Sequence, residues 1–130
     1  MKRRLLLDTQ AFLLAAQDDR ALSDRARRAL LHPETTLYLS LVSLWEMQIK
    51  LSLGKLKLPM PLPAAIQRAV TETGMELLPL HPEHVYKLAV LPYHHRDPFD
   101  RLLAAQALCE RMVVVGNDKI FDAYKVERIW

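Results

Sequence analysis

Short apolar runs alternate along this chain with longer segments of helical pattern, and that alternation restricts the fold more than any other feature. Runs of strand length occur at residues 5–7, 37–39, 76–80 and 113–115, and a fifth strand is expected at 125–129. Strands without polar alternation are buried on both faces, as in a parallel sheet covered by helices on both sides. The pattern predicts an α/β fold, a three-layer α/β/α sandwich around a mostly parallel sheet of four to five strands.

Capping and terminating residues mark the helices expected between these strands. Ser23 is suited to cap a helix, and Gly54 and Gly74 are suited to end the helices that precede them. The expected helices span residues 10–17, 23–31, 40–53, 64–72, 82–91 and 98–111. No internal repeat and no long linker interrupts the pattern. The 130 residues are therefore predicted to form one domain, residues 1–130.

Acidic residues stand where the expected elements meet. Asp8 follows the first strand and Asp118 follows the fourth, while Asp100 opens the last long helix and Glu46 lies within an apolar helix. Sites in open parallel sheets form beyond the carboxyl ends of the strands. Converging carboxylates repel one another and usually persist where a cation neutralises them, and hard oxygen ligands favour Mg²⁺ or Mn²⁺. The four residues predict a metal-dependent site for phosphodiester cleavage.

These acidic residues also have structural explanations. Asp8 and Asp118 can cap the segments that follow them. Asp97 as N-cap, with Pro98 at the first helical position, is a sufficient account of Asp97. Asp100, in the same first turn, can offset the helix dipole. The functional interpretation rests on all of these carboxylates together. If each had only a structural role, their common position near one edge of one sheet would require a separate coincidence for each.

The helix expected at residues 40–53 carries Glu46 and is apolar on two sides. Glu46 can complete a capping box or pair with Lys50, four residues later. One apolar stripe, which Glu46 borders and which is expected to face the core, consists of Val42, Trp45, Ile49 and Leu53. The second stripe consists of Leu41, Leu44, Met47 and Leu51. A helix that is apolar on two faces is buried on two faces, either within the monomer or against a protein partner.

Several sequence blocks occur together in this chain. They are Leu-Leu-Leu-Asp-Thr at residues 5–9, Ser-Leu-Trp-Glu at 43–46, Leu-Gly-Lys-Leu at 53–56, the long block His-Arg-Asp-Pro-Phe-Asp-Arg-Leu-Leu-Ala-Ala-Gln-Ala at 95–107, and Asp118, Phe121 and Tyr-Lys-Val at 124–126. With these blocks the chain resembles the PIN-domain ribonucleases of the VapC type, which are the toxins of toxin–antitoxin pairs. The resemblance extends over essentially the whole sequence.

The resemblance implies the α/β/α fold and metal-dependent endonucleolytic cleavage of RNA, such as tRNA or another structured RNA. The acidic quartet of the family corresponds to Asp8, Glu46, Asp100 and Asp118, with Asp97 as an extra carboxylate beside it. We expect Asp8 and Asp100 to bind Mg²⁺ or Mn²⁺, and Glu46 and Asp118 to act as outer-shell ligands or to orient the attacking water.

The chain departs from the family pattern at two positions. Gly116 stands where relatives often have Ser or Thr, and Gln10 stands where relatives with the Trp-Glu block often have His. Neither change removes a carboxylate. Gly116 removes a hydroxyl that would lie two residues before Asp118, and therefore bears on how Asp118 is oriented.

Basic residues beside the acidic block are candidates for binding the RNA strand. Arg96 and Arg101 flank Asp97 and Asp100 and are expected to contact phosphate, with solvated surface charge as the alternative. A zinc site formed by histidines is a minor alternative, because the sequence offers no thiolate or regular ligand motif beside them; the histidines are His81, His84, His94 and His95.

The resemblance also implies protein partners: an antitoxin whose C-terminal helix lies against the stripe of Leu41, Leu44, Met47 and Leu51, and a second toxin copy in a homodimer. The formal net charge of +3 permits an anionic partner without requiring one. The single cysteine, Cys109, gives no sign of an oxidising compartment. The apolar run at residues 5–7 is too short for a signal peptide, and no run is long enough to span a membrane. We expect a cytoplasmic protein.

Two other functions are less consistent with the sequence than a nuclease. A non-catalytic RNA-binding or regulatory module of the same fold would have no use for intact carboxylates, which repel RNA unless a metal intervenes. An aspartyl phosphotransferase of the haloacid-dehalogenase type needs a second Asp two residues after Asp8, where this chain has Gln10.

Overall fold

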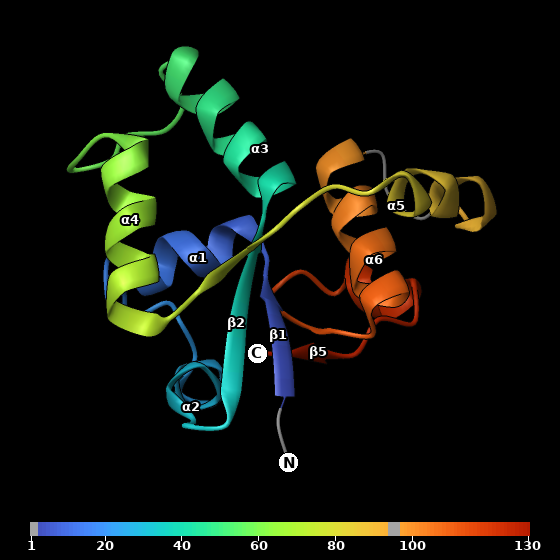
Figure 1. The fold of residues 1–130 in the computed structure, drawn as a ribbon, viewed down its shortest axis with the longest axis horizontal. Coiled ribbons are helices and arrows are strands. Elements are labelled where there is room, and N and C mark those ends of the chain that lie inside the picture. The colour runs from blue at the N-terminus through green and yellow to red at the C-terminus, as the bar shows by residue number, and fades with distance from the viewer. Residues whose placement is uncertain (1–2, 94–96) are drawn as a thin grey trace.

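One five-stranded parallel sheet forms the centre of the molecule (Figure 1). The structure, a computed structural model, describes residues 3–93 and 97–130. The strands are β1 (Arg3–Leu7), β2 (Thr35–Ser40), β3 (Glu76–Leu78), β4 (Val113–Val115) and β5 (Arg128–Ile129). They lie in the order β3-β2-β1-β4-β5, and every neighbouring pair is parallel. The predicted α/β architecture and its parallel sheet are confirmed.

Helices cover both faces of this sheet. In Figure 1, α1 (Thr9–Ala16), α2 (Asp24–Leu31) and α4 (Leu62–Thr73) lie on one side, and α5 (Pro82–Lys87) and α6 (Pro98–Glu110) on the other. The helix α3 (Leu41–Ser52) leaves the end of β2, η1 (Leu88–Val90) is a short 3-10 helix, and α7 (Ile120–Ala123) is one turn long. Alternate side chains of a strand point to opposite faces, so Leu5 and Leu7 pack in one core and Leu6 in the other.

The strand register places the future site. Leu7 is level with Leu39 of β2 and with Val115 of β4, so these three strands end at the same edge of the sheet. The residues that follow them, Asp8 and Gly116, therefore meet at that edge. Among the described residues, no helix is both long and apolar enough to cross a membrane.

Some predicted boundaries were wrong for identifiable reasons. The strand expected at residues 76–80 ends at Leu78, because Pro79 has no N–H to continue the ladder. The helix expected at 82–91 divides into α5 and η1, and the strand expected at 125–129 is reduced to β5. Ser23, Ser40 and Asp97 cap α2, α3 and α6 through side-chain hydrogen bonds.

The two apolar stripes expected on α3 are both only partly correct. The residues of α3 that are buried are Val42, Ser43, Glu46 and Met47. Trp45 and Leu53, expected to face the core, are 59% and 63% exposed. The helix turns a strip between the two expected stripes inward, because Val42 packs in the core beside α6 and Met47 in the core beside α1 and α4. That strip contains two polar residues, which an apolar count does not detect.

Candidate active site

A pocket of about 370 Å³ opens where β1 and β4 end, between α1, α3 and α6. Five carboxylates line it, and these are the sequence-predicted residues Asp8, Glu46, Asp97, Asp100 and Asp118. The remaining lining residues are Thr9, Gln10, Leu13, Lys50 and Asn117. The structure thus brings together the acidic residues that the chain separates by more than a hundred positions.

Asp8 is, with Glu46, one of the two buried carboxylates in this group. Its backbone N–H donates to Val115 O of β4 (3.0 Å), which continues the sheet pairing by one residue. Its Oδ1 accepts the backbone N–H of Ala11 at 2.7 Å, so Asp8 is the N-cap of α1. The other oxygen, Oδ2, lies over Gly116, and a Cβ atom at Gly116 would come within 2.3 Å of it. The capping role and the pocket role therefore belong to the same carboxylate, one oxygen for each.

The protonation of Asp8 reflects this position. Burial raises the pKa of Asp8 from 3.8 to about 7, although the hydrogen bond from Ala11 lowers it. The negative charges of Asp100, Asp118 and Glu46 raise it further. A carboxylate buried among other carboxylates is costly to ionise, and a bound cation would remove much of that cost.

Glu46 is neutralised within the protein. Thr9 Oγ1 donates to Glu46 Oε1 at 2.7 Å, and Lys50 Nζ donates to Oε2 at 2.6 Å. The expected pair between Glu46 and Lys50 is confirmed. Each oxygen of this buried side chain thus accepts a hydrogen bond within the protein.

The remaining three carboxylates come from helix starts. Asp97 Oδ1 accepts the backbone N–H groups of Phe99 (2.8 Å) and Asp100 (3.2 Å), which confirms it as the N-cap of α6. Asp100 follows in the first turn, half-buried in the pocket wall. Asp118 is exposed, and its Oδ1 accepts the backbone N–H of Ile120 at 2.9 Å. Local hydrogen bonds from backbone N–H groups therefore fix the orientation of Asp97, as a helix cap, and of Asp118, in the turn before α7.

Comparison with known families identifies this arrangement. Residues 5–127 match the family described as the PIN domain. The chain belongs to the PIN-domain family. PIN domains are in general nucleases, and the pocket carboxylates all fall within the matched region.

Solved structures share the PIN fold with this chain. VapBC2 from Rickettsia felis, bound to a DNA fragment from its promoter, contains a chain with 17% identity and a TM-score of 0.71, covering 98% of this chain and 99% of that one. DNA-bound VapBC from Salmonella typhimurium gives 16% identity, a TM-score of 0.65 and coverages of 98% and 97%. VapBC-5 from Mycobacterium tuberculosis gives 20%, 0.57, and 96% of each chain. No curated protein matches the sequence significantly.

The structure corrects the role expected for Arg101 in this PIN domain. Its side chain is buried, and its guanidinium donates to Pro92 O (2.8 Å), Leu88 O (3.3 Å) and the Tyr124 hydroxyl (3.3 Å). The ring of Tyr93 covers it at 3.9 Å. These bonds satisfy the carbonyls of the loop before α6, so Arg101 stabilises that loop and does not reach phosphate. Arg96, His94 and His95 lie outside the described residues.

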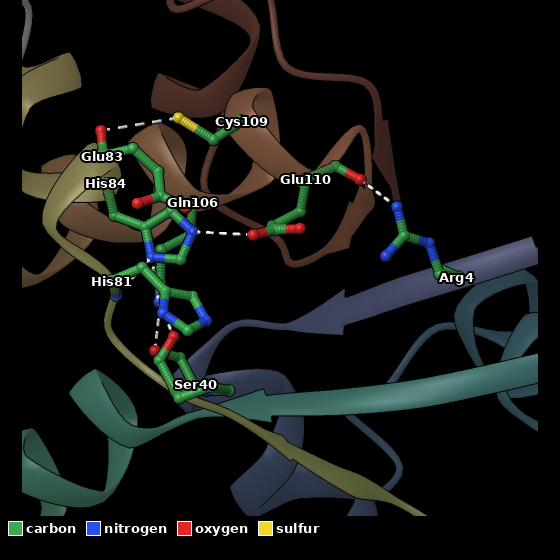
Figure 2. A network of polar contacts seen from close by, with 9 residues as sticks. Arg4, Ser40, His81, Glu83, His84, Gln106, Cys109 and Glu110 are labelled. Carbon is green, nitrogen blue, oxygen red and sulfur yellow. Dashed lines mark hydrogen bonds and ion pairs between the residues drawn. The ribbon is translucent and has the colours of Figure 1, made fainter.

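A second group of polar residues joins α5 to α6 (Figure 2). His84 is buried; its Nδ1 accepts the backbone N–H of His81 (3.0 Å), and its Nε2 faces Glu110 Oε1 at 2.9 Å. The ligand atoms of His84, Glu83 and Glu110 lie within 4.8 Å of one another. Because Nδ1 is an acceptor, the neutral ring carries its proton on Nε2, where a metal would have to bind. The zinc site weighed from the sequence is not supported at His84.

Sequence reasoning did not identify Gln106, which joins this network to the sheet. It is fully buried on α6; its Oε1 accepts from Ser40 Oγ (2.5 Å), and its Nε2 donates to Pro79 O (3.3 Å). Ser40 also caps α3. The network therefore fixes α6, which carries Asp100, against the start of α3, which carries Glu46. The sequence signal was a lone glutamine inside the apolar run at residues 102–108.

Proposed function

We propose that this PIN domain is a metal-dependent endoribonuclease and the toxin of a VapBC-type pair. The observation that carries the proposal is the Asp8 carboxyl, which is buried among three other acidic groups and has a pKa raised to about 7. A fold with no use for a cation would gain stability by losing that charge. Family membership supports nuclease chemistry. The similar structures of toxin–antitoxin complexes support the toxin role.

The residues of the pocket fit a hard divalent cation. Every acidic donor is an oxygen, which suits Mg²⁺ or Mn²⁺. Asp8 and Asp100 would hold the ion: the Oδ2 of Asp8 is not the oxygen that caps α1, and Asp100 lies half-buried in the pocket wall. Bound there, the metal supplies a more acidic water and neutralises phosphate oxygens. This accounts for the cost of keeping the carboxylates together.

The other residues of the pocket would prepare the substrate and the attacking water. Asp118, exposed at the rim with one oxygen used by Ile120, retains an oxygen that accepts a hydrogen bond from water. Thr9 fixes the Glu46 carboxylate from one side. The buried Ser40–Gln106 bond keeps α3 and α6 at a constant separation. The site thus depends on residues that are held in place before any ligand arrives.

RNA cleavage by the purified protein tests the proposal. Wild-type protein, Asp100→Asn and the control Glu127→Gln, an exposed carboxylate outside the pocket, would be incubated with bulk tRNA in Mg²⁺, Mn²⁺ or EDTA. We expect metal-dependent cleavage by wild type and the control, and at least a hundredfold loss in Asp100→Asn. RNA binding without cleavage in either metal would favour the non-catalytic module instead.

We propose that the antitoxin binds a different surface from the α3 stripe. Met47 is fully buried, and Leu44 and Leu51 pack against the same core, so three of the four expected contact residues are used inside the monomer. Only Leu41 is exposed. A hollow of about 300 Å³, with apolar side chains of α1, α2 and α4, offers a better site for an amphipathic helix. Its apolar lining includes Phe12, Ala15, Ala16, Leu30, Ala65 and Ala69.

A charged residue in this hollow tests the antitoxin site. Ala69→Glu, on the wall formed by α4, is expected to weaken antitoxin binding at least tenfold, since a partner helix would bury the added charge. Circular dichroism of the variant alone checks that it folds. Thr71→Glu, on the same helix but outside the hollow, is the matched control. Wild-type affinity in folded Ala69→Glu would place the antitoxin elsewhere.

We also propose a homodimer through the exposed apolar side chains around β3. Leu77 lies beside Leu39 in the sheet register and is 40% exposed on an edge strand. Leu41 and Trp45, 42% and 59% exposed, follow the end of the neighbouring strand. Leu77→Lys should shift the protein from dimer to monomer in sedimentation experiments. A monomeric wild type would exclude the dimer.

A further inference from the structure

Lys50 is the basic residue of the acidic pocket. Five carboxylates and one lysine stand among the residues that line it in the described part of the chain. Arg101, which follows Asp100 in sequence, is buried, donates to the backbone carbonyls of Pro92 and Leu88, and does not line the pocket. Of the described residues that line the pocket, Lys50 on α3 is therefore the cation that an entering anionic group meets.

The geometry leaves this cation accessible. Lys50 Nζ lies 2.6 Å from Glu46 Oε2, and the Lys50 side chain is 46% exposed while that of Glu46 is 8% exposed. The pKa of Lys50 is raised, first by the hydrogen bond with Glu46 and then by the charges of Glu46, Asp97 and Asp100, so the ammonium group carries its proton at neutral pH. An ammonium group has three N–H donors, and Glu46 accepts one.

We infer that Lys50 binds a non-bridging oxygen of the substrate phosphodiester at the pocket. A phosphodiester anion approaching five carboxylates is repelled unless nearby positive charge offsets them. A metal held by Asp8 and Asp100 supplies it on the β1 and α6 side, and Lys50 supplies it on the α3 side. The pair with Glu46 holds the ammonium at the pocket wall before the substrate binds. This inference rests on the proposed nuclease function.

A purely structural role for Lys50 makes different predictions. If Lys50 only held Glu46 and α3 in place, its loss would disorder the carboxylates and weaken metal and RNA binding together. If Lys50 contacts phosphate, removing a positive charge beside the carboxylates leaves metal affinity unchanged or raises it, while RNA affinity falls. The two roles therefore predict different changes in metal affinity when Lys50 is replaced: a decrease for the structural role, and no change or an increase for phosphate binding. Metal affinity is measured without RNA cleavage.

The experiment compares Lys50→Met, Lys50→Arg and the control Lys57→Met, which removes the same charge from an exposed lysine outside the pocket. Mn²⁺ affinity is measured by calorimetry without RNA. Binding of a fluorescent single-stranded 20-nucleotide RNA is measured by anisotropy in Ca²⁺ at several salt concentrations, with the RNA checked for integrity afterwards. Cleavage of tRNA by wild type in Mg²⁺ is recorded in parallel.

We expect Lys50→Met to bind RNA about tenfold more weakly at low salt, with a salt dependence shallower by about 0.7 to 1 in log–log slope, as for one lost phosphate contact. Its Mn²⁺ affinity should equal or exceed that of wild type. Lys50→Arg should retain most RNA affinity, and Lys57→Met should change it less than twofold. Unchanged RNA binding in Lys50→Met, or a parallel loss of Mn²⁺ and RNA binding, would overturn the inference. If either of these results is obtained while wild type cleaves RNA, the Lys50 inference fails and the proposed nuclease function stands. If wild type neither binds nor cleaves RNA, the inference and the proposed function both fail.

Discussion

Replacing Asp8 by Asn is expected to stabilise the metal-free protein at and above neutral pH. The pKa of Asp8 is raised from 3.8 to about 7, chiefly by burial and despite the Ala11 hydrogen bond. Below pH 4 the carboxyl is protonated in both folded and unfolded chains, so its contribution to stability is fully present. Between pH 4 and 7 the unfolded chain loses the proton and the folded chain keeps it, and stability falls. Above pH 7 the loss is complete.

The size of this loss follows from the shift. Each pKa unit corresponds to about 1.4 kcal/mol, so the roughly three-unit shift costs about 4 kcal/mol at pH 8 and about 1.5 kcal/mol at pH 5. Asn at this position still caps α1 through its side-chain oxygen, but loses about 1 kcal/mol of charge–dipole interaction. The net gain for Asp8→Asn is therefore about 3 kcal/mol at pH 8, or roughly 10 °C in Tm for a chain of this length.

The assay is urea unfolding of wild type and Asp8→Asn in EDTA from pH 5 to 8.5. The difference between the two proteins is the informative quantity, because other titrating groups cancel in it. Asp19→Asn is the matched control: Asp19 also accepts a local backbone N–H, from Ala21 at 2.9 Å, but it is exposed and outside the pocket. A difference that stays near zero or falls as pH rises would refute the electrostatic account of the pocket.

Three other changes test the same geometry. Saturating Mg²⁺ or Mn²⁺ should raise Tm of the wild type, by about 2.7 kcal/mol at a hundred times Kd, and Asp8→Asn should abolish the shift in a thermal melt. Gly116→Ala should lower Mn²⁺ affinity at least tenfold in calorimetry with the fold retained, because its Cβ would come within 2.3 Å of Asp8 Oδ2 and displace that oxygen; unchanged affinity would show that Oδ2 is not a ligand. Arg101→Met should lower the free energy of unfolding by about 3 kcal/mol, since it removes the hydrogen bonds that the buried guanidinium donates to the carbonyls of Leu88 and Pro92 and to the Tyr124 hydroxyl; an unfolding curve like that of wild type would contradict this role.

The sequence predicted the sheet because its signal was local. The apolar runs at β1, β2 and β4 are short and lack polar alternation, as expected for strands that are buried on both faces of a parallel sheet. Residues at strand ends were found by the same reasoning, since parallel strands bring their carboxyl ends together. The shorter β3 and β5 depended on pairing with a neighbour, and pairing partners cannot be read from one segment alone.

The orientation of side chains was harder to predict than the position of elements. The inward strip of α3 contains Ser43 and Glu46, so a count of apolar residues did not identify this strip as the buried face. It predicted that Trp45 faces the core, whereas Trp45 is exposed. Arg101 illustrates the same limit. Its partners are carbonyls of residues 88 and 92 and the Tyr124 hydroxyl, and only the folded chain brings these around one guanidinium. Polar residues turned inward are where sequence periodicity fails.

Asp8 has a structural role and a proposed functional role at the same time, so the two explanations of this residue are not alternatives. Its two oxygens have different tasks: Oδ1 accepts from Ala11 and fixes the side chain, and Oδ2 faces the cluster over Gly116. A carboxylate that only accepts a local backbone N–H can do so while exposed, as Asp19 does from Ala21, where solvent keeps ionisation easy. Burial beside three other acidic groups does not improve a cap and raises the pKa against it. The cap therefore explains how Asp8 is oriented, but it does not explain why a carboxylate with so high a cost of ionisation is placed among other acidic groups; the proposed cation site does.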